Sequence, residues 1–464
     1  MTKNQSRSYE IDMCSGPILS KVLRFAVPLM FSSMLQLLFN AADIIVVGRY
    51  AGDNALAAVG SNSSLITLLT GLFIGLSVGT NILAARHHGA KEDKELSATV
   101  HTSIKLALFS GLLLTLIGLV SARTVLIWMN CPDNVLSLAA LYLRIYTVGM
   151  TATMLYNFGA AILRASGDTR RPLYYLSLAG VVNIVLNLFF VIVCDMSVAG
   201  VAIASVISQY ISAFFVLRAL TRDPGPCRLE LRQLRFNKKK LRQILRIGLP
   251  AGLQASLFSL ANVVIQSSVN LFGESAMAGN SAANSIEGFV YASISAFEQA
   301  SASFCSQNMG AGNYQRIWKI FIQIQLCAVV FSLVLGGSAI LLGPDLLSIY
   351  SLSDASMETA MIQLRVFCSS YALCGLMDVT ASALRGVGYN IMPMITTLIG
   401  ACGLRLLWLA TVFQIPSCHN IQTVFLSFPV SWAVTYSAQL VSFLLVYRRL
   451  LKKRGNPASL PVLD

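Results

Sequence analysis

The sequence predicts an all-α polytopic membrane protein with twelve transmembrane helices in two six-helix bundles. Of its 464 residues, 55% are hydrophobic and only 12% are charged, about half the charged fraction of soluble domains. Its mean hydropathy is +0.68, and apolar runs of about 20 residues, the length that crosses a bilayer, recur along the chain. The third observation is an internal duplication.

The duplication is clearest in two short polar turns, each lying between two apolar runs. Residues 162–175 read ILRASGDTRRPLYY and residues 383–396 read ALRGVGYNIMPMIT. Seven residue pairs keep an offset of 221: Arg164 and Arg385, Gly167 and Gly388, Pro172 and Pro393, Gly52 and Gly273, Gly89 and Gly310, Asp133 and Asp354, Arg144 and Arg365. Pro28 and Pro250 match at 222. A register kept over this length indicates a repeat rather than chance.

Each repeat contains six predicted spans. In the first half they are 24–48, 55–84, 99–120, 139–163, 172–194 and 199–220. In the second half they are 245–272, 277–306, 317–341, 359–384, 392–415 and 424–447. Because six is even, both halves insert in the same orientation, and we expect a pseudo-two-fold axis along the membrane normal with the substrate path between the halves.

The spans divide the chain into five predicted parts. These are a polar N-terminal lead-in (1–20), an N-lobe (21–220), a basic cytoplasmic linker (221–244), a C-lobe (245–450) and a cytoplasmic tail (451–464). The net charge of +14 comes from basic residues that gather on one side of the predicted spans, in the lead-in, the 86–98 loop, the 164–171 turn, the linker and the tail. By the positive-inside rule both termini face the cytoplasm. This placement explains the charge without nucleic-acid binding.

The first two spans carry one proline, one acid and several glycines. Pro28 removes a backbone hydrogen bond, so we expect a kink there that faces protein or a cavity. Asp43 lies inside the first span, where an ionisable group is costly and therefore a functional candidate. Gly75 and Gly79, at four-residue spacing in the second span, indicate close helix packing.

Polar residues recur in the fifth and sixth spans. Asn183 and Asn187 share a helix face at i, i+4, and Ser205 and Gln209 form a similar stripe. Asp43 lies about 28 Å into its span at 1.5 Å per residue, and Asn187 and Ser205 reach a similar depth in the outer half of the membrane. These oxygens suit a bound Na⁺ or a proton-binding Asp43. An interhelical hydrogen-bond cluster without a transport role explains them equally well.

The second half holds four further ionisable groups. Glu287 and Glu298 lie in the eighth span, Asp378 in the tenth and Arg405 in the eleventh. Arg405 can neutralise Glu287 or Asp378, since a buried charge normally requires a partner. A structural ion pair is therefore the alternative to a coupling or substrate-binding role for these residues.

Other chemistry finds little support in the sequence. The ten Cys lack metal-ligand spacing and mostly lie in apolar runs, and the adjacent His87 and His88 do not share a helix face. HExxH and P-loop motifs are absent. We therefore expect no enzyme activity, no cofactor and no metal beyond a possible Na⁺.

Several motifs lie between about residues 21 and 453: RFAVPLMFSSMLQLLFNAADIIVVGRYAG in the first span, LRASGDTRRP and LRGVGYNIMP in the turns, AGVAIASVISQ in the sixth span, and GNSAANSIEGFVYASISAFEQA with SQNMGAGN in the eighth. Together they resemble the multidrug and toxic compound extrusion (MATE) family. The resemblance implies a bacterial inner-membrane antiporter that expels lipophilic, often cationic drugs in exchange for H⁺ or Na⁺.

The resemblance also implies an N-lobe cation site at Asp43, Asn183, Asn187 and Ser205. Where relatives commonly carry Asp, this chain has Asn187, so the site holds one formal negative charge and favours protonation of Asp43 over Na⁺. Glu287 and Asp378 fit a pattern of one bacterial branch, which makes the C-lobe a second candidate for coupling.

The function predicted from the sequence is cation-coupled drug export by alternating access, in the bilayer and as a monomer. A flippase for a lipid-linked precursor is the first alternative, and it requires several Arg to line the cavity for a pyrophosphate. A passive channel or a receptor is the second, and it requires no coupling carboxylate.

Overall fold

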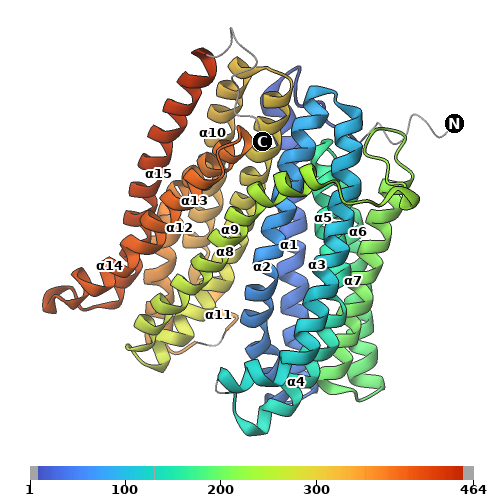
Figure 1. Ribbon diagram of the computed structural model, residues 1–464. Coiled ribbons are helices and arrows are strands. Elements are labelled where there is room, and N and C mark those ends of the chain that lie inside the picture. Colours follow the sequence, from blue (N-terminus) through green and yellow to red (C-terminus); the bar gives the residue numbers. More distant parts are fainter. Residues whose placement is uncertain (1–8, 130, 351, 453–464) are drawn as a thin grey trace. The chain divides into compact units, whose positions relative to one another are not determined.

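A computed structural model describes residues 9–129, 131–350 and 352–452 of the chain. Within these ranges every regular element is a helix and there is no strand, which confirms the all-α prediction (Figure 1). Residues 1–8 of the predicted lead-in and 453–464 of the predicted tail lie outside the described part.

The first half contains α1 (Ile18–Tyr50), α2 (Asp53–Ala90), α3 (Asp93–Trp128), α4 (Asp133–Val148), α5 (Met150–Ala165), α6 (Arg170–Leu188), the π-helix η2 (Phe189–Val193) and α7 (Ser197–Thr221). The 3₁₀ turn η3 (Leu231–Gln233) follows. The second half contains α8 (Lys238–Asn270), α9 (Glu274–Gly310), α10 (Tyr314–Leu341), α11 (Gly343–Ser348), α12 (Asp354–Gly386), α13 (Ile391–Thr397), the π-helix η4 (Leu398–Gly403), α14 (Leu404–Ala410), the 3₁₀ turns η5 (Val412–Gln414) and η6 (Pro416–Cys418), and α15 (Ile421–Lys452).

All twelve predicted spans are helical, although they differ in form. Among the described residues, ten segments are long and apolar enough to cross a membrane, and α4 with α5 forms an eleventh that bends by 44°. The bend at Gly149 lies inside the span predicted over 139–163, which the structure forms from two helices rather than one. The twelfth, α9, is rich in Ser and Asn and carries Glu287 and Glu298, so it is too polar to count by hydropathy. It packs most extensively on α12, and a helix that packs against protein does not need an apolar surface on every side.

The duplication reappears in the backbone. Gly52 and Gly273, which precede α2 and α9, have φ of +83° and +88°. Gly167 and Gly388, in the two polar turns, have φ of +96° and +106°. Glycine adopts these left-handed angles without the steric cost of a Cβ atom. Matching angles 221 residues apart show that the two halves repeat the same turns.

The chain forms two compact units whose boundaries fall inside helices. Unit 1 contains Phe31–Gly252 with the described part of Met1–Asp12, and unit 2 contains Met13–Met30 with the described part of Leu253–Asp464. The first part of α1 therefore belongs to unit 2, and the first part of α8 belongs to unit 1. Pro28 and Pro250 lie inside these two helices, each within three residues of a boundary.

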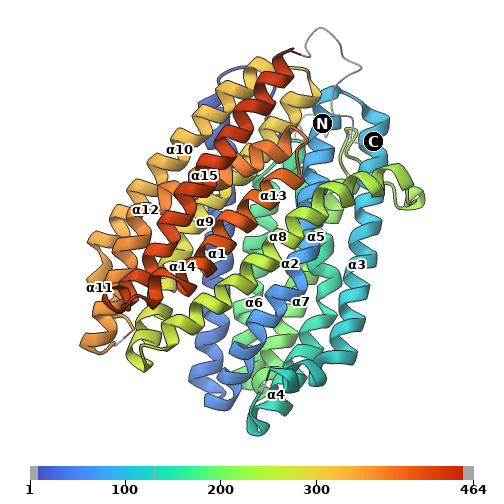
Figure 2. The same cartoon turned by 60° about the vertical axis from the view of Figure 1, so that its left-hand side comes forward.

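Each unit has its own apolar core. In unit 1, α5 packs against both α3 and α7 (Figure 2), and Val46 and Val47 of α1 join a buried cluster near Asp43. In unit 2, α9, α10, α12 and α15 pack together. Phe367, Tyr371 and Trp432 form an aromatic centre there. Polar side chains placed against these cores are held away from bulk water.

Candidate functional site

The polar residues predicted in the first half meet around Asp43 in unit 1. The Asn187 amide donates a hydrogen bond to Oδ1 of Asp43, and the Ser205 hydroxyl donates to Oδ2 over 3.4 Å. Asn187 also donates to Oδ1 of Asn183 over 3.3 Å, and Asn183 donates to Ser205 over 3.4 Å. Three helices, α1, α6 and α7, thus contribute to one connected cluster.

Local structure explains how these side chains converge. Asn183 and Asn187 are buried on one face of α6, one helical turn apart. The π-helix η2 begins at Phe189, directly after α6 ends, and π turns often occur at functional sites. Ser205 lies on the buried face of α7.

A cavity of about 270 Å³ adjoins Asp43. Asp43, Asn183 and Ser205 line it together with Gln36, Phe39, Asn40, Ile44, Val59, Ser63, Ile66, Thr67, Tyr142, Tyr146, Leu176, Ala179, Gly180, Ser208, Gln209 and Ser212. This volume is below the roughly 300–1,000 Å³ of typical ligand pockets. It suits an ion with water, or one group of a larger molecule.

Several lining residues were not predicted as part of the site. Tyr142 and Tyr146 stack with ring centres 5.7 Å apart, and both line the cavity with Gln36 and Asn40. The i, i+4 spacing of the tyrosines was a usable signal, because such pairs share a helix face. Gln36 and Asn40 of α1 have the same i, i+4 spacing, and Asn40 lies three residues before Asp43, so the sequence carried a usable signal for them as well.

The site offers one formal charge and several neutral oxygens. Both carboxylate oxygens of Asp43 accept hydrogen bonds from uncharged donors. Oδ1 of Asn187 is buried without a hydrogen-bond partner among the described residues. Since the set holds a single acid, it can bind one proton or coordinate a monovalent cation weakly.

Glu287 lies apart from the other acids of unit 2. It is 4% exposed, and the Tyr371 hydroxyl donates to its Oε2 over 3.3 Å. Its Oε1 has no hydrogen-bond partner in the described part of the chain. A buried carboxyl with so few partners is a candidate proton carrier.

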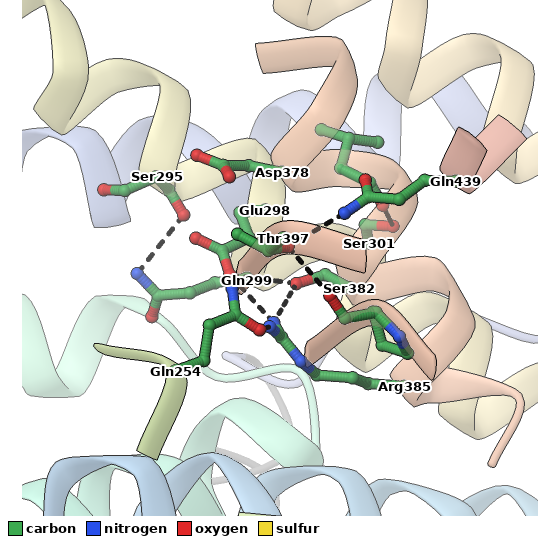
Figure 3. Close-up of polar contacts among 12 residues, drawn as sticks. Gln254, Ser295, Glu298, Gln299, Ser301, Asp378, Ser382, Arg385, Thr397 and Gln439 are labelled. Atoms are coloured by element: carbon green, nitrogen blue, oxygen red, sulfur yellow. Dashed lines mark hydrogen bonds and ion pairs between the residues drawn. The ribbon is translucent and has the colours of Figure 1, made fainter. Parts of the chain in front are cut away.

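Glu298 and Asp378 lie near each other in a second polar cluster of unit 2 (Figure 3). Glu298 accepts from Ser382 over 3.0 Å and pairs with Arg385 over 3.4 Å. Arg385 also donates to Gln254 over 2.7 Å. The Cys374 thiol donates to Asp378 over 3.8 Å. The partner of Glu298 is therefore the arginine of the duplicated turn, which the sequence analysis did not pair with an acid.

Arg405 was expected to pair with Glu287 or Asp378, but among the described residues it forms a salt bridge with neither acid, although Asp378 is close enough for a Coulombic interaction. Among the described residues, no carboxylate oxygen of either acid lies within 4.0 Å of a guanidinium nitrogen of Arg405, which is the limit for a salt bridge. Its Nε donates to Ser431 over 2.8 Å, and its guanidinium carbon lies 4.0 Å from the ring centre of Phe428. Aromatic rings of α8 and α15, those of Phe258, Phe428 and Trp432, pack against the guanidinium where a carboxylate was predicted.

The structure also describes Pro28, His87 and His88, the other residues discussed from the sequence. Helix α1 continues through Pro28 without a break. His87 and His88 form no metal site, and Nε2 of His87 lies 2.7 Å from Nζ of Lys240. In the described part of the chain, no group of three His, Cys, Asp or Glu residues is arranged to hold a metal.

Comparisons with known proteins agree with this architecture. The MatE family model matches residues 28–189 and 250–410. The probable multidrug resistance protein YoeA of Bacillus subtilis is 28% identical over 91% of this chain and 91% of its own. A protein of Shewanella oneidensis named FAD transporter is 24% identical over 90% of this chain and 93% of its own. A solved outward-facing multidrug resistance MATE transporter of the MOP superfamily has a TM-score of 0.89 at 23% identity, over 95% of this chain and 98% of that one.

Proposed function

This chain belongs to the MatE family, and from that premise we propose that it is a secondary antiporter. Its cargo would be lipophilic, often cationic drug-like molecules, exported in exchange for H⁺ or Na⁺ by alternating access. The name of the Bacillus subtilis relative, a probable multidrug resistance protein, supports this cargo. The Shewanella relative is named for FAD, so members of this family differ in what they carry.

The observation that carries the coupling proposal is the placement of Asp43. Its carboxylate adjoins a 270 Å³ cavity in unit 1 and is contacted by neutral donors. A carboxyl at a membrane-buried cavity can take up a proton from one side and release it to the other. Protonation removes the charge that attracts a cationic cargo, which makes binding of the two competitive.

The proton is the coupling ion that this site favours. A Na⁺ site gains most from several full negative charges, whereas Asn187 is neutral and the carboxylate of Asp43 is the single charge of the cluster. Both carboxylate oxygens are already within reach of N–H or O–H donors. Glu287, Glu298 and Asp378 in unit 2 would contribute a second proton-binding step.

An ion gradient across the membrane can supply the free energy that drives cargo export. Exchange of one H⁺ for one monovalent cationic cargo moves no net charge across the membrane, so the pH gradient supplies the driving force, about 1.4 kcal/mol per pH unit. Cargo and ion need only favour different states of the protein, because a ligand that binds both states equally shifts neither. Loss of the proton from Asp43 on the cytoplasmic side would restore affinity for the next cargo molecule.

The protein would act in the bacterial plasma membrane as a monomer, with both termini in the cytoplasm. Basic residues of the segment between α7 and α8 support this orientation: Arg222, Arg228, Arg232, Arg235, Lys238 and Lys239 are all exposed. Positive charge near span ends favours the cytoplasmic side. The lobes at 21–220 and 245–450, joined by the 221–244 linker, would be the moving parts.

The test is transport by purified protein in liposomes, with a pH gradient and a Na⁺ gradient imposed separately. Wild-type protein should accumulate a fluorescent cationic dye against its gradient when the pH gradient is applied. Asp43→Asn should lose this accumulation, while Asp133→Asn, at an exposed position of the same unit, should keep it. Normal accumulation by Asp43→Asn contradicts the role of Asp43, and dye movement that only dissipates the dye gradient indicates a channel.

A further inference from the structure

Arg405 is the largest fully buried side chain of the described residues, with 1% of it exposed. It lies in α14 directly after the π-helix η4. Its Nε donates to Ser431 over 2.8 Å, but Nη1 and Nη2 have no hydrogen-bond acceptor among the described residues. An arginine is almost never buried unless its charge is paired.

Three aromatic rings surround the guanidinium. Its central carbon lies 4.0 Å from the ring centre of Phe428, 5.2 Å from Phe258 and 5.7 Å from Trp432. Rings attract a cation through their faces, but they do not accept the in-plane N–H bonds of a guanidinium as a carboxylate does. The rings therefore stabilise the positive charge of Arg405 but leave its N–H groups available to donate hydrogen bonds to another acceptor.

A further donor lies in the same cluster. Nε1 of Trp432 also has no acceptor in the described part of the chain, and Trp432 is 4% exposed. Three buried nitrogen donors, two from Arg405 and one from Trp432, thus lack an acceptor. Such groups normally find a partner, since an unmade hydrogen bond at a buried donor is costly.

The nearby acids of unit 2 do not supply that acceptor. Glu298 pairs with Arg385, Glu287 accepts from Tyr371, and neither these acids nor Asp378 forms a salt bridge with Arg405 within the described residues. A carboxylate is the acceptor that best matches two parallel guanidinium N–H bonds. The geometry therefore fits an anionic group brought by a bound molecule.

We propose that Nη1 and Nη2 of Arg405, with Nε1 of Trp432, form a subsite that binds a carboxylate group of the cargo. The rings of Phe258 and Phe428 would contact the apolar body of the same molecule. Both rings are only partly buried, and rotation of one of them would be the step that opens the guanidinium to a ligand. This subsite rests on the proposed function and deepens it, because it extends the cargo from cations to molecules that also carry a carboxylate.

The experiment compares two cargo molecules that differ at one group: a xanthene dye with a free benzoate and its methyl ester. Uptake of each is measured in liposomes that contain wild type, Arg405→Gln, Arg405→Lys or the exposed control Arg365→Gln. Arg405→Gln should reduce uptake of the free acid about tenfold or more, the value of a charge-assisted hydrogen-bond pair. Uptake of the ester should stay within about twofold, Arg405→Lys should be intermediate, and the control should match wild type.

A second variant covers the case in which Arg405→Gln does not fold. Trp432→Phe keeps an aromatic ring and removes only the N–H donor, so it should lower binding of the free acid about threefold and leave the ester unchanged. Binding to purified protein is measured for both dyes by fluorescence anisotropy, which does not depend on transport. Equal losses for acid and ester in the folded variants, or no loss for the acid, overturn the subsite.

The anisotropy measurement also separates the subsite from the proposed function. Wild-type protein that binds the free acid more tightly than the ester, loses this preference in Arg405→Gln and transports neither dye contradicts the proposed function and supports the subsite. Wild-type protein that transports both dyes, with the acid insensitive to Arg405→Gln, supports the function and contradicts the subsite.

Discussion

At the scale of single residues, the cluster around Asp43 is defined by an amide. Asn187 lies against Asp43 and donates to it, where a carboxylate would repel it. Two unit charges about 4 Å apart interact by about 4 kcal/mol at the effective dielectric of a protein surface. The neutral amide removes this repulsion and, with it, the second charge that a metal cation requires.

The first prediction follows from this amide. Asn187→Asp should convert proton-driven export into Na⁺-stimulated export, because two adjacent carboxylates bind Na⁺ much better than one. We expect stimulation by Na⁺ of about fivefold or more over wild type, measured in liposomes with a Na⁺ gradient at constant pH. Ser208→Asp, which also lines the cavity but whose hydroxyl donates to the backbone of Ser205 rather than to Asp43, is the control, and equal stimulation by both variants would count against a specific pair at Asp43.

The residue scale also shows what sequence can and cannot predict. The similar depth of Asp43, Asn187 and Ser205 follows from the fixed rise of a helix, and the three side chains do meet. The pairing of Glu298 with Arg385 was not predicted, because it depends on the rotation of α9 relative to α12. Hydropathy contains no information on that rotation when both helices are buried.

At the scale of elements, α2 and the first part of α8 cross with almost no space between their backbones. A Cβ atom on Gly75 would lie 2.3 Å from the backbone of Gly252, and one on Gly79 would lie 2.6 Å from the carbonyl oxygen of Ile244. Contacts this short do not occur for real side chains, so alanine would force the helices apart.

The second prediction concerns this crossing. Gly75→Ala should destabilise the protein by about 1–3 kcal/mol, as overpacking does. Gly60→Ala is a matched control in the same helix, since nothing lies within 4 Å of a Cβ atom there. The measurement is the melting temperature in detergent, followed by loss of the monodisperse peak in size-exclusion chromatography. Equal melting temperatures for the two variants would mean that the crossing is not tightly packed.

A third prediction concerns the start of α8, where a lysine is buried. Nζ of Lys240 lies 2.5 Å from Glu95 and 2.7 Å from His87, and the side chain is 1% exposed. Lys240→Met should lower stability by about 1–3 kcal/mol, because it removes the partner of a buried imidazole. The exposed neighbour Lys239 provides the control, and Lys239→Met should have the same melting temperature as wild type. Equal melting temperatures for Lys240→Met and Lys239→Met would mean that the buried contact of Lys240 does not stabilise the protein.

The sequence predicted which segments are helical, but it did not predict where those helices bend or change their hydrogen-bonding pattern. Apolar runs define twelve segments because a bilayer fixes their length. The 44° bend between α4 and α5 and the π-helix η4 before Arg405 were missed, since both arise from tertiary packing at single turns.

At the scale of the whole molecule, the repeat places a proline near each unit boundary. The units divide between Met30 and Phe31 and again between Gly252 and Leu253. Pro28 and Pro250 precede these points in α1 and α8. A proline weakens the backbone hydrogen bonding of a helix and lets it bend at low cost, so these two positions are suited to act as hinges.

The fourth prediction tests the hinges. Pro28→Ala and Pro250→Ala should each lower the export rate by about threefold to tenfold while cargo affinity stays unchanged, as expected for a slowed conformational step. Pro429→Ala, at a proline inside α15 and within one unit, should export at the wild-type rate. Export rates come from liposome assays and affinities from anisotropy. A loss of affinity that parallels the loss of rate would indicate damage to a binding site instead.

The helices that pass from one unit to the other have a consequence for dividing the polypeptide. A cut in the segment after α7 separates Lys238–Gly252 from unit 1 and leaves Met13–Met30 on the wrong fragment for unit 2. Neither fragment alone contains all of its own fold. Activity from two separately encoded fragments therefore requires that they be synthesised together, so that each can complete the other during insertion.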